Sequence, residues 1–260
     1  MRILVTFAID AEFAPWKSRH PFVPYEFWES GRRRDFDLFR ANIGANEVTV
    51  LLTGMGGENA KKAIGTILQE QHDFCVSTGL AGALDPDLKL GEIVVGRGAE
   101  SADRTRKAES DPELVRFALA LGARAVNVFV TSDTIVATGG EKELLSTSGG
   151  VVEMETQHIL AAARQSCLPA VAVRAISDVA EEDLPVDFER IADSHGHVKV
   201  GGLLRELALH PHRLPLLVRF GRQSRAAAGA LADFLDRYIP AVEKDWHPVR
   251  WTRIEEISAT

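Results

Sequence analysis

The sequence of 260 residues has only two cysteines and no long apolar run. Cys75 and Cys167 lie far apart, each within an apolar stretch, which predicts two buried, reduced thiols and excludes a disulfide framework. No stretch reaches the ~18 apolar residues that a membrane-spanning helix needs. Residues 1–9 lead directly into acidic positions without a cleavage site. We therefore expect a cytoplasmic protein that is neither exported nor inserted in a membrane.

The sequence also lacks an excess of positive charge. Its net charge of −7 disfavours binding to nucleic acid, and the short basic run at residues 32–34 is typical of a solvated loop. No change of composition and no low-complexity linker divides the chain, and 45% of its residues are hydrophobic, which is enough for one large core. We predict a single domain that spans residues 1–260.

Apolar, β-branched runs bounded by Gly, Asp or Pro predict six buried strands, at residues 2–8, 47–52, 73–78, 92–96, 126–131 and 169–176. Apolar residues at helical spacing predict helices between several of them, at residues 60–68, 114–121 and 159–163. This alternation predicts an α/β fold with a central, mainly parallel (mixed) sheet flanked by helices, in which ligands bind beyond the carboxyl ends of the strands. Residues 185–239 are typical of helical cover, and residues 15–45 of a hairpin or a lid.

A first glycine-rich segment, TGMGGENA at residues 53–60, would let the backbone come close to a ligand just before a predicted helix. Asn59 and Ala60 stand where the pattern of a dinucleotide-binding turn would end in its third glycine. The segment therefore disfavours a dehydrogenase and, taken alone, identifies no ligand.

Two later segments also combine glycines with polar groups. They are STGLAGALDPDLKLGEIVV at residues 77–95 and VVEMETQ at residues 151–157, which VRAISD at residues 173–178 follows. In this order the segments resemble the purine nucleoside phosphorylase and uridine phosphorylase superfamily, over most of the chain. The closest pattern is that of the methylthioadenosine/S-adenosylhomocysteine nucleosidases. This resemblance implies a nucleoside phosphorylase-like α/β domain, a homodimer, a small purine nucleoside as partner and no cofactor.

The resemblance implies roles for five residues, four of them in these segments and the fifth, Glu12, at an acidic strand-end position near the start of the chain. Glu12 would be the base that orients an attacking water, and Asp178 the acid that protonates the purine at N7. Glu155 would bind the ribose hydroxyls, Met154 would pack against the sugar and Glu153 would lie beside it. These assignments predict an enzyme that cleaves the N-glycosidic bond of a nucleoside.

The other substrate-binding residues implied by the resemblance are of two kinds. Two of them, Ser177 and Arg174, would hold the segment that ends in Asp178. The rest would flank the purine base or line the second glycine turn, and they are Ile135, Val136, Phe188, Gly79, Ala81 and Gly82.

The chemistry of glycosidic cleavage requires the same groups, because it passes through an oxocarbenium-like sugar cation with a poor leaving group. Asp178 follows an apolar strand, where partial desolvation would help it to keep the proton that the base needs. Glu155 would accept two ribose hydroxyls, and these hydrogen bonds would strengthen as charge builds on the ring. Each carboxylate alone also fits a helix cap. Their order and spacing together favour an active site.

The sequence departs from the pattern of the phosphorylases at the second glycine turn. Where these usually place a phosphate-binding arginine and a hydroxyl, it has Ser77 and Leu80. We therefore predict hydrolysis of an adenine nucleoside, such as methylthioadenosine or S-adenosylhomocysteine. Phosphorolysis is an alternative, with phosphate held by another arginine such as Arg97.

A second resemblance concerns the tail at residues 200–231, which is similar to hopanoid-associated members of the superfamily that act on an adenosyl-lipid. It implies phosphorolysis of a nucleoside with an apolar 5′ group, with contact to a membrane surface as one interpretation of the Leu-rich tail. Ordinary helix packing and a dimer contact are the favoured interpretation of the same leucines. A non-catalytic nucleoside-binding protein is a further alternative, disfavoured because Glu12, Glu155 and Asp178 are all present.

Five acidic and histidine side chains could be proposed as metal ligands, and they are Asp193, His195, His197, His210 and His212. They form no pair at helical spacing on one face, so we predict no metal.

Overall fold

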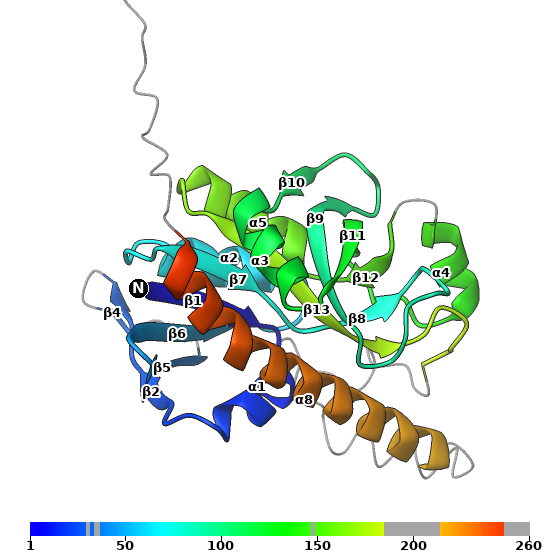
Figure 1. Ribbon diagram of the computed structural model, residues 1–260. Coiled ribbons are helices and arrows are strands. Elements are labelled where there is room, and N and C mark those ends of the chain that lie inside the picture. Colours follow the sequence, from blue (N-terminus) through cyan, green and yellow to red (C-terminus); the bar gives the residue numbers. More distant parts are fainter. Residues whose placement is uncertain (30–31, 34–36, 147–148, 185–213, 247–260) are drawn as a thin grey trace, which may run out of the picture.

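The computed structural model describes residues 1–29, 32–33, 37–146, 149–184 and 214–246 (Figure 1). The strands are β1 Arg2–Phe7, β2 Val23–Tyr25, β3 Trp28–Glu29, β4 Arg32–Arg33, β5 Asp37–Ile43, β6 Asn46–Leu52, β7 Phe74–Ser77, β8 Leu80–Ala83, β9 Ile93–Ser101, β10 Lys107–Glu109, β11 Arg124–Thr131, β12 Val151–Glu153 and β13 Ala170–Asp178. The helices are α1 Asp10–Lys17, α2 Gly57–Ile67, α3 Pro112–Ala120, α4 Gly139–Ser146, α5 Thr156–Gln165 and α8 Leu214–Asp245.

One mixed sheet organises the described part of the chain. Its order is β10-β9-β11-β12-β8-β13-β7-β1-β6-β5-β2. Strands β13, β7, β1 and β6 are parallel neighbours, as the sequence predicts, while β5 and β2 continue the edge in antiparallel pairing. Strand β9 also pairs with β13, so β9, β11, β12, β8 and β13 close into a ring. The chain is therefore a single α/β domain with a mixed sheet flanked by helices.

Strand β13 shows why the central runs lack polar alternation. All nine of its residues are buried, because helices cover both faces of the sheet. Successive side chains point to opposite faces. Val171, Val173 and Ala175 therefore pack in one core cluster, and Ala172 and Ile176 pack in the other.

Each face of the sheet has its own set of helices. Apolar residues of α3 and α8 join the first cluster, together with Phe13 and Trp16 of α1. Helices α2 and α5 supply the second cluster. The carboxyl-terminal half of α8 is buried through Ala227 to Val242, whereas its amino-terminal half, gold in Figure 1, extends away from the body of the molecule. The core thus fixes one end of α8 and leaves the other end beside the strand-end loops.

All six predicted strands and the three predicted internal helices are confirmed. The segment at residues 15–45 contains the edge strands β2 and β5 and the short β3–β4 ladder, which agrees with the hairpin and not with the lid. Arg32 and Arg33 form β4, so the expected loop was wrong for these two residues, and Arg34 lies outside the described residues. Of the predicted helical cover, residues 185–213 are also outside them.

The two cysteines differ in environment. Both are free, and Cys75 is buried, where desolvation raises the pKa of its thiol to about 12. Cys167 is exposed in the turn after α5, so the prediction of a second buried thiol was wrong. Its φ of 53° shows that it serves the turn and not the core.

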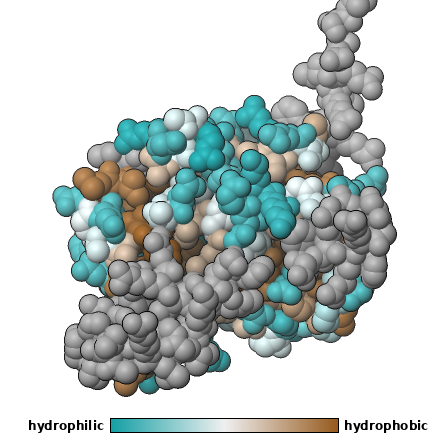
Figure 2. All heavy atoms as spheres, turned by 180° about the vertical axis from the view of Figure 1, so that it is seen from behind, coloured by the Kyte–Doolittle hydropathy of each residue, from teal (hydrophilic) through white to brown (hydrophobic). Residues whose placement is uncertain are grey.

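The surface shown in Figure 2 is mainly hydrophilic around an apolar recess. Among the described helices, none is long and apolar enough to cross a membrane.

Candidate active site

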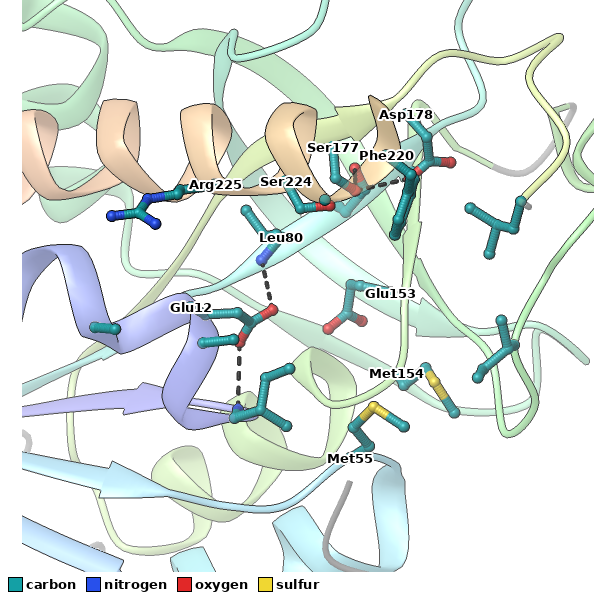
Figure 3. Close-up of a pocket in the computed structure, with 18 of the residues that line it drawn as sticks. Glu12, Met55, Leu80, Glu153, Met154, Ser177, Asp178, Phe220, Ser224 and Arg225 are labelled. Atoms are coloured by element: carbon teal, nitrogen blue, oxygen red, sulfur yellow. Dashed lines mark hydrogen bonds between the residues drawn. The ribbon is translucent and has the colours of Figure 1, made fainter. Parts of the chain in front are cut away.

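A cavity of about 990 Å³ opens where β1, β12 and β13 end. This volume is at the upper end of the range for small-molecule sites. Helices α1 and α8 also line it, through residues such as Ala14 and Leu217. Figure 3 shows Glu12, Glu153 and Asp178 around this space, each from a different element. The position agrees with the rule that ligands bind beyond the carboxyl ends of strands.

Glu12 lies in the first turn of α1, three residues after the end of the strand-to-helix loop at Ile9. Its Oε2 accepts hydrogen bonds from the backbone N–H of Ala8 at 3.0 Å and of Ile9 at 3.5 Å, and its Oε1 from that of Leu80 at 3.0 Å. Burial raises the pKa of this carboxyl above its usual value, and the three amides and the charge of Arg174 offset part of the effect. The raised pKa makes this carboxylate a stronger base than a solvated glutamate.

Asp178 ends β13 next to an irregularity in the sheet. The pairing of β13 with β8 shifts between Ile176 and Asp178, and such bulges re-aim side chains beside active sites. The Ser177 hydroxyl donates a hydrogen bond to Asp178 Oδ1 at 2.7 Å, as expected for a residue that holds this segment. Gly82 of β8 faces the other oxygen, since a Cβ on Gly82 would lie 2.8 Å from Asp178 Oδ2.

Lys142 of α4 is a functional candidate that sequence reasoning missed. Its side chain is buried, and its Nζ donates hydrogen bonds to Asp178 Oδ2 at 2.5 Å, to the Val179 carbonyl at 2.8 Å and to the Glu182 carbonyl at 2.9 Å. With the Ser177 hydroxyl on Oδ1, each oxygen of Asp178 thus accepts a hydrogen bond. A lysine in a short, mainly polar helix gave no sign of this contact.

Glu153 is held by donors from four residues. Its Oε2 accepts hydrogen bonds from Arg174 Nη2 at 2.8 Å, from the Thr156 hydroxyl and backbone N–H, and from the Glu155 N–H, while its Oε1 accepts one from Thr131 Oγ1. Although Glu153 lines the cavity, its carboxylate is occupied within the protein. It fixes the turn in which Met154 and Glu155 follow.

Arg174 lies behind the site and not beside Asp178. It is 1% exposed and donates hydrogen bonds to Glu153, to Thr156 Oγ1 at 2.7 Å and to Ser77 Oγ at 3.3 Å. The predicted contact of Arg174 with the Asp178 segment is therefore replaced by one with the Glu153 turn. The physical reason is that Arg174 points to the face of β13 where the buried carboxylate of Glu153 needs a counter-charge.

Glu155 faces the glycine-rich turn that follows β6. Its Oε1 accepts a hydrogen bond from the backbone N–H of Gly56 at 2.7 Å. Burial, together with the neighbouring negative charge of Glu153, raises its pKa to about 8. Gly56 has a φ of 90°, a conformation that favours glycine, and a Cβ there would meet Met154. The first glycine segment and the VVEMETQ segment thus form one corner of the site.

The remaining predicted residues fall in three groups. Ala81, Gly82, Ile135, Val136, Met154 and Ser177 all line the cavity. Gly79 lies just behind it, against the Glu12 carboxylate. Phe188 lies outside the described residues. So do Asp193 and the four histidines considered as metal ligands, His195, His197, His210 and His212. Elsewhere, the described residues include no cluster of three or more His, Cys, Asp or Glu side chains that would hold a metal.

An aromatic residue of α8 also reaches the site. Phe220 lines the cavity and projects into it from the helix, near Ser177 and Asp178 (Figure 3). The sequence assigned the aromatic contact with the base to Phe188. Phe220 belongs to a Leu-rich helix, so its pattern indicated packing alone.

Among the described residues, two arginines line the cavity. Arg97, the predicted alternative for binding phosphate, is exposed on β9 and is not one of the residues that line the cavity. Of the two arginines that line it, Arg19 is paired with Asp233 and Asp236, at 2.6 and 2.9 Å. The other, Arg225, is an exposed residue of α8.

An α/β domain with acidic side chains around a strand-end cavity defines an enzyme that acts on a small molecule. Comparison of the sequence with profiles of protein families identifies the family. A sequence profile described as the phosphorylase superfamily matches residues 2–204. The chain belongs to this superfamily of enzymes, as its motifs indicate.

Solved structures show the same fold over 92% of this chain. Native futalosine hydrolase of Helicobacter pylori superposes with a TM-score of 0.70 at 17% identity, covering 92% of this chain and 97% of that one. The 5′-methylthioadenosine/S-adenosylhomocysteine nucleosidase of Neisseria meningitidis, in complex with methylthio-immucillin-A, gives 0.69 at 20% identity, with 92% and 98% covered. The Campylobacter jejuni nucleosidase gives 0.69 at 16% identity, with the same coverage. At these identities the likeness establishes the fold.

Proposed function

We propose that this enzyme hydrolyses the N-glycosidic bond of a purine nucleoside. The observation that supports it most directly is the position of the Glu12 carboxylate, which accepts hydrogen bonds from the backbone N–H groups of Ala8, Ile9 and Leu80. Such amides, at a helix start and a glycine turn, are the donors that would hold an anionic co-substrate. A carboxylate already occupies them and repels a second anion, whereas it accepts a hydrogen bond from water.

In this reaction Glu12 acts on the attacking water, on one side of the glycosidic bond, and Asp178 acts on the leaving purine, on the other side. A water held by Glu12 attacks C1′ of the sugar as the bond from C1′ to N9 breaks and its electron pair moves onto the purine. Glu12 takes the proton of the water, and Asp178 gives a proton to N7 of the purine. The products are the free base and the sugar with a hydroxyl at C1′. Glu12 and Asp178 both line the cavity, which supports these roles.

Binding of the sugar falls to the corner formed by Met154 and Glu155. Met154 lines the cavity, and Glu155 follows it in the chain, 8% exposed and not itself a lining residue. Its Oε1 accepts the hydrogen bond from Gly56, so the ribose hydroxyls would bind at Oε2. Ionised Glu155 would stabilise the positive charge that develops on the sugar ring. Its pKa of about 8 means that this ionised form increases as the pH rises through that value. Ile135, Val136 and Phe220 provide apolar surface for the base.

The substrate that we propose is an adenine nucleoside such as methylthioadenosine or S-adenosylhomocysteine. Support comes from the motifs VVEMETQ and VRAISD and from the shared fold of nucleosidases that carry these names. A homodimer and a cytoplasmic location are proposals of the same resemblance, and size-exclusion chromatography with light scattering would test the dimer.

A second candidate is phosphorolysis of a nucleoside with a large apolar substituent, as in hopanoid-associated members of the superfamily. The observation in its favour is the arm of the cavity between α1 and α8. This arm is lined by small or apolar residues on both helices, among them Ala11, Ala14, Pro15, Leu217, Phe220 and Gly221. The guanidinium of Arg225 also lines it, and would offer a bidentate contact to phosphate.

Base release decides between these candidates. Purified enzyme would be assayed with methylthioadenosine, S-adenosylhomocysteine and adenosine in phosphate-free buffer, beside Asp178→Asn. We expect adenine release without phosphate and its loss in the variant. A strict requirement for phosphate would favour the second candidate. Inertness of the folded enzyme towards all three nucleosides, with and without phosphate, would contradict the proposal.

A further inference from the structure

Lys142 is a buried charged side chain to which the proposed reaction gives no task. It is 1% exposed, and it does not line the cavity. Its ammonium group has three donors, and all three are used, by Asp178 Oδ2 and by the carbonyls of Val179 and Glu182. Complete use of three donors is the arrangement of a charged ammonium group. Lysine is seldom fully buried without a partner of this kind.

These contacts have two consequences for Asp178. First, they tie α4 to residues 178–182, and with the Ser177 hydroxyl on Oδ1 they fix both oxygens of the carboxyl. Second, each oxygen of the carboxyl already accepts a hydrogen bond, from Ser177 Oγ or from Lys142 Nζ. Asp178 must nevertheless hold a proton in order to give it to the leaving base.

The other charged groups around the pair are engaged elsewhere or exposed. Glu141 accepts the N–H groups of Ala137 and Thr138, which lower its pKa, and Asp183 accepts the N–H of Gly139. Glu182 faces Arg219 of α8 at 3.4 Å, and Glu181 is exposed. On the sheet side, Glu153 is neutralised by Arg174. Lys142 is therefore the charge in direct contact with Asp178.

We propose that Lys142 is a positioning residue for Asp178: its ammonium group fixes Oδ2 as a hydrogen-bond acceptor and so holds the carboxyl group in place for the proton that passes to the leaving base. The proton enters from solvent, because the ammonium keeps its own three bonds. This inference rests on the proposed function, since it assigns Asp178 to the base.

The separate effects on kcat and KM of base release test this role. The variants are Lys142→Met and Lys142→Gln, which remove the ammonium group, and Lys142→Arg, which retains a cationic donor. The control is Lys62→Met, on an exposed lysine of α2. We expect kcat to fall by about 10- to 100-fold in the first two variants with little change in KM, to recover in part in Lys142→Arg and to be unchanged in Lys62→Met. An unchanged kcat in a folded Lys142→Met or Lys142→Gln enzyme overturns the proposal, as does a loss in Lys142→Arg equal to that in Lys142→Met.

A binding measurement on the wild-type enzyme covers the case in which both variants fail to fold. Calorimetry of adenine in two buffers of different ionisation enthalpy gives the number of protons taken up on binding, and a free base leaves the ribose site at Glu155 empty. We expect about one proton per adenine near neutral pH, because Asp178 accepts hydrogen bonds at both oxygens and must take up a proton before it can donate one to the base. Binding without proton uptake overturns the role of Lys142. If no nucleoside is cleaved, the proposed function fails, and proton uptake with adenine still decides the role of Lys142. The absence of both cleavage and adenine binding overturns both.

Discussion

Gly79 and Glu12 approach so closely that a Cβ on Gly79 would lie 3.0 Å from Glu12 Oε2. Gly79 also has a φ of 145°, which L side chains rarely adopt. The second glycine turn is therefore shaped around the carboxylate that we propose as the base. This contact favours water as the nucleophile, because it holds the Glu12 carboxylate against the backbone N–H of Leu80, where an anion would otherwise bind.

Gly79→Ala should lower kcat by on the order of 10- to 100-fold, because a small displacement of a catalytic group has a large effect on rate. The matched control is Gly91→Ala, where φ is 75° but nothing lies within 4 Å of the added Cβ. Both variants should lose about 1–3 kcal/mol of stability through backbone strain. Only Gly79→Ala should lose activity among the molecules that remain folded. Equal kcat values for the two folded variants would contradict the positioning of Glu12 by this turn.

Glu155→Gln should change the pH dependence of stability. The pKa of Glu155 is raised to about 8, so the folded protein holds this proton more tightly than the unfolded chain does. Its contribution is fully present below the unfolded value of 4.5 and is lost as the pH rises through 8. Glutamine carries no such proton. The free energy of unfolding of the variant, relative to wild type, should therefore rise by on the order of 1 kcal/mol per pH unit across this range.

Urea unfolding at several pH values measures this difference. The control is Glu113→Gln, at an exposed glutamate of α3, which should follow the wild-type curve. A constant difference between Glu155→Gln and wild type at all pH values would mean that Glu155 is not protonated in the folded enzyme at neutral pH.

Arg174→Met should destabilise the protein by about 3–5 kcal/mol, because it leaves the Glu153 carboxylate buried without a counter-charge. The double variant Glu153→Gln with Arg174→Met should recover part of this loss, since no unpaired charge remains. Arg116→Ala, at a surface arginine that is 64% exposed, should change stability by less than about 0.5 kcal/mol. Chemical denaturation would show these differences. Full additivity of the two substitutions would contradict a direct pair.

The apolar arm of the cavity makes a prediction about substrate size. A Cβ on Gly221 of α8 would meet nothing within 4 Å, so leucine fits there and narrows the arm. Gly221→Leu should raise KM for nucleosides with a bulky substituent and leave KM for adenosine nearly unchanged. Gly65→Leu, in open space on α2, is the control for a leucine in a helix. Equal KM ratios in both variants would show that the arm holds no part of the substrate.

The sequence predicted the elements whose burial is continuous and missed those whose pattern is short. Strand β13 has nine buried residues and was evident, whereas β12 has three residues and β8 has four, with glycine among them. Helix α4 was not predicted, because its buried residue is a lysine and it therefore lacks the apolar pattern of a packed helix. Apolar periodicity reports contact with the core, and these elements have little of it.

In the site, Glu12, Glu153 and Asp178 were predicted to lie together, and all three line the cavity. This could be predicted because the strands of one sheet end at a shared edge. The partners of these carboxylates were not predictable. An arginine inside an apolar strand indicates a buried counter-charge, but nothing in the pattern chooses Glu153 over Asp178 for Arg174. The partner of Asp178 is Lys142, 36 residues earlier in the chain, and only the three-dimensional arrangement reveals it.

In the proposed reaction Glu12 both activates water and excludes phosphate. The most direct test is the rate of base release from methylthioadenosine across a phosphate titration that begins at zero, with the sugar product identified by mass spectrometry, for wild type and Glu12→Gln. We expect a full rate at zero phosphate, the free sugar as product at every phosphate concentration, and a loss of about 10²- to 10⁴-fold in kcat for the variant. A rate that is zero without phosphate and rises with it to yield the sugar 1-phosphate would show that the enzyme is a phosphorylase and that Glu12 does not exclude phosphate.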